Sequence, residues 1–231
     1  KKQINNVGHL IEFGACLSIK HDGKTPLLLA ASTEKPSIKI IQKLCSSLMP
    51  TQLGAKDDPF GDTSLHHLVR QKQYKETKFL LKAGANPSPK NLIGETPLHD
   101  AVRSKCEPIL ELLLEYGAGV DAVNEEGNTP LHIASEIGFH AAVEIILRTR
   151  ANIMYPNNQG YTPLHVMIRC RNRSEGSQQR ATSFALMVEK ASYTIDAAIN
   201  NGEHKGCTPL LLLALSCGGE TYNDRQFINT L

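Results

Sequence analysis

Histidine is the residue whose type and spacing in this chain most directly suggest chemistry. An imidazole can bind a metal ion or transfer a proton near neutral pH. Four histidines preceded by Thr-x-Leu recur every 33 residues, namely His66, His99, His132 and His165. This row suggests a metal site or an acid–base site. The other histidines show no ligand spacing; they are His9, His21, His67, His140 and His204.

Other patterns that would indicate catalysis or cofactor binding are missing from the sequence. There is no glycine-rich phosphate loop, no dinucleotide fingerprint and no Gly-x-Ser-x-Gly nucleophile turn. The six cysteines include no Cys-x-x-Cys pair, and we expect them to be reduced thiols. Two pairs of carboxylates, Asp57 with Asp58 and Glu125 with Glu126, fall in expected loops and are interpreted as solvated. The sequence therefore predicts no catalytic residue, no cofactor and no metal.

The elements that position these residues are clearest between residues 91 and 123. Gly94 permits a turn, and Thr96 stands where a helix begins, with Pro97 at the first helical position, where the missing N–H costs nothing. Leu98, Ala101 and Val102 follow at the spacing of one apolar helical face. We therefore expect a short first helix.

A second helix is expected after Glu107-Pro108. Its residues 109–114 are apolar at nearly every position, so it must be covered on more than one side by neighbouring layers. Gly117 suits the left-handed residue that follows a helix. The unit is thus helix, turn, helix and a loop into the next copy, and a fixed period of this length indicates a repeat architecture.

These residues resemble the ankyrin repeat. Gly-x-Thr-Pro-Leu-His, an Ala-containing helix and then Leu-Leu-x-x-Gly-Ala recur in register, as in residues 94–99 and 113–118. The resemblance implies an all-α ankyrin-repeat solenoid of stacked helix-turn-helix units with hairpin-like loops. It also implies that each motif histidine bonds near the motif threonine and the neighbouring loops, which makes its role structural. The metal and acid–base interpretations are then much weaker.

We expect residues 1–231 to form a single domain and to be part of a larger protein, because the chain starts at Lys1 rather than Met. The expected units are 1–19 (partial), 20–57, 58–90, 91–123, 124–156, 157–202 and 203–231 (partial). Unit 20–57 has extra residues around 46–55, and unit 157–202 has an insertion placed between its helices at Arg171 to Thr182, expected to be mobile. Arg150 replaces the glycine that usually ends the second helix, so a different helix end is expected there.

The resemblance implies a concave face lined by first helices and loop tips. Arg70, Arg103 and Arg169 occupy equivalent sites, so stacking would place them in one row, interrupted by Glu136, that could bind anions. Apolar residues on the loop tips are expected to be exposed beside this row and resemble an interface hot spot, although ordinary surface variation explains them about as well. The candidate partner-binding residues are Arg70, Gln71, Arg103, Ser104, Glu136, Ile137, Arg169, Phe60, Leu92, Ile93 and Tyr161.

The leading hypothesis is a non-catalytic protein–protein interaction module, a scaffold or adaptor that binds an extended acidic or hydrophobic segment of another protein. The alternative is a regulatory or targeting arm of a larger enzyme, channel or effector whose activity lies outside this chain. Nucleic-acid binding through Arg169, Arg171, Arg173 and Arg180 is disfavoured, because the net charge is only +2. No apolar run is long enough to cross a membrane, so we expect a soluble chain. The cysteines interpreted as reduced thiols favour an intracellular protein, in the cytoplasm rather than the nucleus.

Overall fold

The computed structural model describes residues 9–57, 59–170 and 177–190. Contacts within the chain divide it into two units, residues 1–119 and 120–231, which are described separately below. Apart from two isolated β-bridges, His21 with Lys24 and Lys56 with Thr63, the regular structure of the described residues is helical. The prediction of an all-α fold is confirmed.

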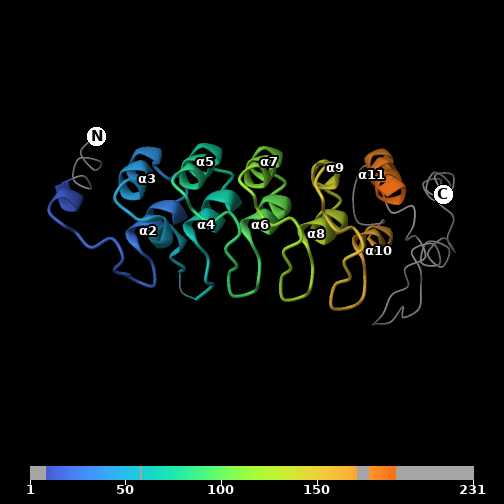
Figure 1. The fold of residues 1–231 in the computed structure, drawn as a ribbon, viewed down its shortest axis with the longest axis horizontal. Coiled ribbons are helices and arrows are strands. Elements are labelled where there is room, and N and C mark those ends of the chain that lie inside the picture. Colours follow the sequence, from blue (N-terminus) through green and yellow to red (C-terminus); the bar gives the residue numbers. More distant parts are fainter. Residues whose placement is uncertain (1–8, 58, 171–176, 191–231) are drawn as a thin grey trace. The chain divides into compact units, whose positions relative to one another are not determined.

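The first unit consists of helix pairs arranged in two layers (Figure 1). The first helices of the pairs pack side by side in one layer; they are α2 (Pro26–Ser32), α4 (Ser64–Arg70) and α6 (Pro97–Arg103). The second helices form the other layer; they are α3 (Ile38–Cys45), α5 (Tyr74–Lys82) and α7 (Glu107–Glu115). The extra residues expected around 46–55 contain a short 3₁₀ helix, η1 (Pro50–Gly54).

The second unit repeats this arrangement. Helix α8 (Pro130–Ile137) packs against α10 (Pro163–Arg169), and α9 (His140–Leu147) packs against α11 (Ser177–Lys190). Because α11 begins at Ser177, the prediction that the whole of 171–182 is an inserted loop is wrong. Several predicted features lie outside the described residues: the partial unit 203–231, His204, Arg171, Arg173 and the side chain of Arg180.

The first helices begin as the sequence predicts. Thr96 is the extended N-cap residue of α6 and Pro97 is its first helical residue. Four such helices, α4, α6, α8 and α10, also have a capping box in which the histidine at the third helical position accepts a hydrogen bond from the backbone of the N-cap threonine. In α8 and α10 the threonine hydroxyl in turn accepts a hydrogen bond from the histidine backbone N–H, at 3.4 and 3.5 Å. These bonds satisfy N–H groups that have no partner within the helix.

The second helices end in two ways. After α7 the chain turns at Gly117, whose φ of 80° is readily adopted only by a residue without a Cβ. After α9 the C-cap is Arg148 in the right-handed region, and no left-handed residue is found at Arg150. The helix end near Arg150 thus differs from that of the glycine-terminated repeats, as expected.

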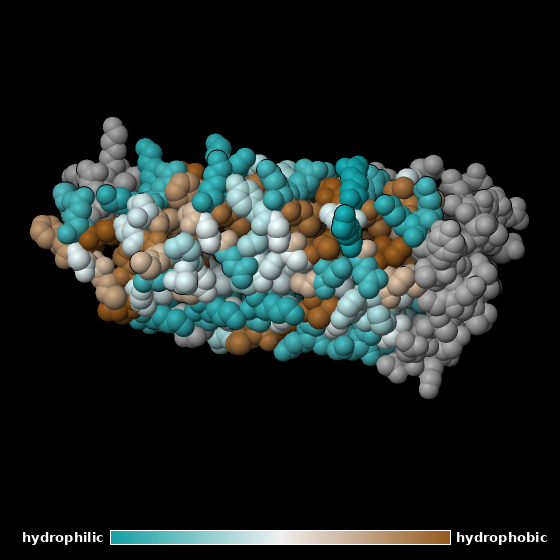
Figure 2. All heavy atoms as spheres, in the orientation of Figure 1, coloured by the Kyte–Doolittle hydropathy of each residue, from teal (hydrophilic) through white to brown (hydrophobic). Residues whose placement is uncertain are grey.

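The core is aliphatic. In α6, Leu98, Ala101 and Val102 are completely buried, and in α7 so are Leu110 and Leu113. On the face drawn in Figure 2, hydrophilic side chains cover much of the helical surface, with apolar atoms between them. The described residues contain no helix that is long and apolar enough to span a membrane.

Candidate functional site

The repeated histidines hold the turns that begin the first helices. In α4, His66 Nδ1 accepts a hydrogen bond from the backbone N–H of Thr63 at 3.1 Å, and the same bond in α6, between Thr96 and His99, also measures 3.1 Å. The second unit repeats it from Thr129 to His132 at 3.1 Å and from Thr162 to His165 at 3.2 Å. All four imidazoles are buried. The structural role implied for these histidines is confirmed.

The other ring nitrogen connects one repeat to the next. His66 Nε2 lies 3.1 Å from the carbonyl oxygen of Glu95, and His132 Nε2 lies 2.9 Å from that of Tyr161. Burial lowers the pKa of His66 to about 4, and the bond to the Glu95 carbonyl only partly opposes this effect. His66 is therefore neutral at pH 7 and donates to that carbonyl through Nε2.

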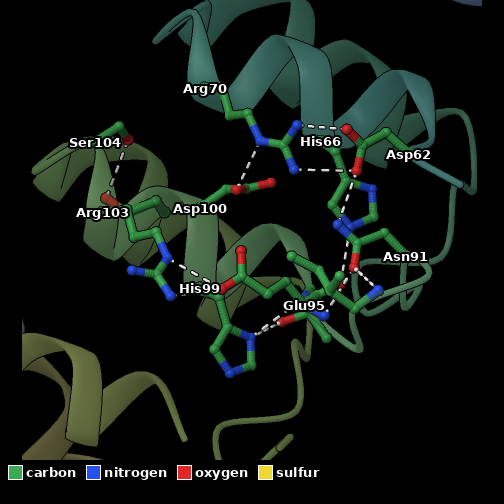
Figure 3. A network of polar contacts seen from close by, with 12 residues as sticks. Asp62, His66, Arg70, Asn91, Glu95, His99, Asp100, Arg103 and Ser104 are labelled. Carbon is green, nitrogen blue, oxygen red and sulfur yellow. Dashed lines mark hydrogen bonds and ion pairs between the residues drawn. The ribbon is translucent and has the colours of Figure 1, made fainter. Parts of the chain in front are cut away.

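Arg70, at the end of α4, is held by two acidic side chains, Asp62 from its own repeat and Asp100 from the next one (Figure 3). Its terminal nitrogens bond both oxygens of Asp62, and its Nε donates to Asp100 Oδ1 at 2.8 Å. Burial alone would raise the pKa of Asp62, but hydrogen bonds from Arg70 and Asn91 and the charge of Arg70 outweigh it and hold that pKa below its usual range. Arg70 is thus already paired with acidic groups of its own chain, although its side chain is 40% exposed.

The arginines at the equivalent positions of two further repeats also contact a side chain of their own chain. Arg103, at the end of α6, donates to Glu95 Oε1 from Nε at 3.0 Å and from Nη2 at 2.6 Å. Arg169, at the end of α10, lies over the ring of Tyr161, with its guanidinium carbon 5.0 Å from the ring centroid. A cation over an aromatic face is attracted by the ring quadrupole.

These three contacts follow one sequence rule that the repeat motif itself does not contain. The first position of the rule is the residue directly before the motif threonine, and the second is an arginine eight residues later. The pairs are Asp62 and Arg70, Glu95 and Arg103, and Tyr161 and Arg169. In the repeat 124–156 the same two positions hold Asn128 and Glu136, and in the repeat 20–57 they hold Lys24 and Ser32, so neither has an arginine at the second position. The pairing went unpredicted, and comparing equivalent positions eight residues apart would have revealed it.

The residues next to the arginines are partly used within the chain. Gln71 Nε2 donates to the carbonyl of Ala31 at 3.2 Å, and the Ser104 hydroxyl donates to that of Ala101 at 3.2 Å. Glu136 is exposed and Ile137 is half-buried. Arg70 and Arg103 belong to the first unit and Arg169 to the second, so the single row of three arginines stays a prediction.

An apolar hollow lies at the loop tips of the first unit. It has a volume of about 430 Å³ and is lined by Pro59, Phe60, Asp62, Arg70, Asn91, Leu92 and Ile93. Phe60 is 66% exposed, Leu92 64% and Ile93 52%, so the expected exposure of these three is confirmed. Figure 2, in the orientation of Figure 1, shows hydrophobic residues at its lower edge, where Figure 1 shows the loop tips. The hollow combines an apolar rim with a neutralised Asp62–Arg70 pair.

A second hollow of about 430 Å³ lies in the second unit and is mainly polar. It brings together three of the predicted residues, Glu136, Tyr161 and Arg169, with Glu125 and Glu126 at the loop tip. Among the described residues, no carboxylate lies within ion-pair distance of Arg169, which distinguishes it from Arg70 and Arg103.

Two expectations about exposure are wrong. Tyr161 is only 3% exposed, because its ring lies under Arg169 and packs edge-on against His165. Asp57 is 3% exposed rather than solvated, because its carboxylate accepts hydrogen bonds from the backbone of Asp62 at 2.7 Å and from His67 Nε2 at 2.8 Å. Asp58 lies outside the described residues.

Asp57, Asp62 and His67 are close enough together to surround a metal ion. Their ligand atoms are already used, however: Asp57 binds His67 and the Asp62 backbone, while both Asp62 oxygens bind Arg70. A metal ion would have to displace these bonds. The group is better described as the hydrogen-bonded support of the loop tip.

Comparison with known families agrees with the repeated architecture. A family model described as "Ankyrin repeats (3 copies)" matches residues 37–124 and 116–178, which together make up more than half of the chain. A search of curated protein sequences found no match.

Proposed function

Since the chain belongs to the ankyrin repeat family, we propose that it binds an extended segment of a partner protein. Members of this family are generally protein–protein interaction modules and are typically non-catalytic. The proposed surface is formed by the first helices and the loop tips. The observation that carries this proposal is the apolar hollow of the first unit, where three large apolar side chains are more than half exposed.

The rim of this hollow suits an apolar side chain of the partner. Phe60 and Leu92 lie on successive loop tips, whose backbones are joined by a hydrogen bond from Leu92 N–H to the Phe60 carbonyl at 3.0 Å. A rim fixed in this way loses little conformational entropy when a partner binds. Because Asp62 neutralises Arg70 at the floor, the inserted group should be uncharged.

Arg169 is the proposed contact for a carboxylate of the partner. Arg70 and Arg103 already bind acidic groups of their own chain, whereas Arg169 lies on the Tyr161 ring without a carboxylate partner among the described residues. A guanidinium oriented in this way can form two parallel hydrogen bonds to a carboxylate. The acidic and hydrophobic partner expected from the sequence thus has two separate candidate contacts, one in each unit.

The experiment that tests this proposal removes the apolar rim. The variant Phe60→Ala/Leu92→Ala/Ile93→Ala should lose the partner protein that the full chain captures from a cell lysate, with at least about tenfold weaker binding, equivalent to about 1.4 kcal/mol. Phe13→Ala is the matched control, because Phe13 is 88% exposed and lies outside the hollow.

Quantitative mass spectrometry of the captured proteins identifies the partner as the protein retained by Phe13→Ala and lost by the triple variant. Circular dichroism should show an unchanged helical content, because all three side chains are exposed. Equal capture by the wild-type chain and the triple variant would rule out the hollow as a binding site.

A further inference from the structure

Asp100 is a buried carboxylate that the proposed binding function does not use. It lies within α6 and is 3% exposed. In the repeats on either side, the equivalent positions hold His67 and Ile133, so the acid is particular to this repeat. Its Oδ1 accepts a hydrogen bond from Arg70 Nε at 2.8 Å. Its Oδ2 is buried and has no hydrogen-bond partner.

The charges around Asp100 do not balance. Asp62 and Arg70 face it from the preceding repeat, and Glu95 and Arg103 belong to its own repeat (Figure 3). If all these groups were ionised, three carboxylates would face two guanidiniums, leaving one negative charge in excess. Each guanidinium is only partly exposed, so solvent cannot fully compensate this excess.

The remaining groups near Asp100 do not supply the missing positive charge. His66, on the adjacent helix α4, is neutral at pH 7 because burial lowers its pKa to about 4. His67, also on α4, is bonded through Nε2 to the buried carboxylate of Asp57 at 2.8 Å, so any positive charge on it is matched by that carboxylate. His99, on α6 itself, is buried and bonded to Thr96. Helix α7, which packs against α6, carries only acidic charged residues, and these lie on its exposed surface: Glu107, Glu111 and Glu115.

A buried charge that lacks full compensation is commonly neutralised by protonation. We propose that Asp100 is a proton-binding site and that loss of its proton weakens the first unit as the pH rises toward neutrality. The proton is carried on Oδ2, since Oδ1 already accepts from Arg70. Consistent with this geometry, burial raises the pKa of Asp100 to about 7, although Arg70 opposes the effect.

The direction of the pH dependence follows from proton linkage. An unfolded Asp100 has an ordinary pKa, for which the reference value is 3.8. Between that pH and about 7 the folded chain holds a proton that the unfolded chain has released, so the free energy of unfolding falls as the pH rises through this window. Above it, Asp100 is ionised in both states and contributes no further change.

Asp100→Asn tests the proposal, because the amide oxygen still accepts from Arg70 but the side chain cannot titrate. Urea unfolding of the full chain is followed at pH 5, 6, 7 and 8 through the amide NMR signals of α4 and α6. Relative to Asp100→Asn, the wild-type unfolding equilibrium constant should increase by up to about tenfold per pH unit between pH 5 and 7. The control Glu111→Gln changes an exposed carboxylate on α7 and should follow the wild type at each pH.

Parallel pH profiles for the wild type and Asp100→Asn would overturn the proposal. Should Asp100→Asn not fold, the carboxyl carbon of Asp100 in the unmodified chain gives the answer by NMR titration. A chemical-shift midpoint near pH 7 supports the proton site, and a midpoint near pH 4 or below contradicts it.

Discussion

The three arginines at equivalent positions of their repeats differ in what their side chains contact. Arg70 and Arg103 are anchored by acidic residues eight positions earlier, whereas Arg169 is oriented by an aromatic ring. A surface ion pair contributes little stability by itself, but Asp62 and Glu95 are buried, so each would be costly without its arginine. The paired arginines therefore stabilise the repeats, and Arg169 is the one proposed to contact a partner.

At the residue scale, His66→Ala should destabilise the first unit by about 2–4 kcal/mol, because it leaves a cavity and removes the partners of the Thr63 N–H and the Glu95 carbonyl. The effect should depend on pH. His66 has a pKa of about 4 when folded and 6.5 as its reference value, so the stability it contributes is present above pH 6.5 and is lost as the pH falls toward 4.

Urea unfolding between pH 4 and 8 measures both effects. His21→Ala is the control, because the His21 side chain is 85% exposed and its loss should change stability by less than about 0.5 kcal/mol. If His66→Ala proved no more destabilising than His21→Ala, the turn-holding role of the motif histidine would be refuted.

At the scale of elements, neighbouring loop tips are joined by hydrogen bonds between their backbones, which requires the two backbones to lie close together. The Asn158 N–H donates to the Glu126 carbonyl at 3.0 Å, and the Leu92 N–H donates to the Phe60 carbonyl at the same distance. Beside these bonds stand Gly127, with φ +76°, and Gly61, with φ +70°. A Cβ on Gly127 would lie 2.7 Å from the backbone nitrogen of Asn158, so the contact between tips requires glycine.

We therefore predict that Gly127→Ala destabilises the second unit by more than the roughly 1–2 kcal/mol expected from the left-handed conformation alone. Gly117→Ala measures that conformational cost separately, because Gly117 has φ +80° but a Cβ added there would meet nothing within 4 Å. Thermal or urea unfolding compares the two variants. Equal losses would mean that the close approach of the tips is unimportant.

At the scale of the whole molecule, the sequence was sufficient for the architecture but not for its polar network. The start of α6 at Pro97 and the turn at Gly117 follow from local signals within one repeat. The contact of Arg70 with Asp100 joins residues 30 positions apart and depends on how closely α4 and α6 stack. The burial of Tyr161 has a local cause, because His165 and Arg169, which surround its ring, lie four and eight residues later in the same repeat, and a comparison of these positions between repeats could have predicted it.

The most direct test of the central claim is a photo-crosslinking measurement that locates the bound partner on the chain. A benzophenone amino acid is placed at Phe60 or Leu92 on the loop tips, or at Lys75 on the exposed surface of α5 in the other helical layer. Crosslinking to the captured partner from Phe60 and Leu92, with none from Lys75, is the result that we predict. Crosslinking from Lys75 alone would contradict binding by first helices and loop tips.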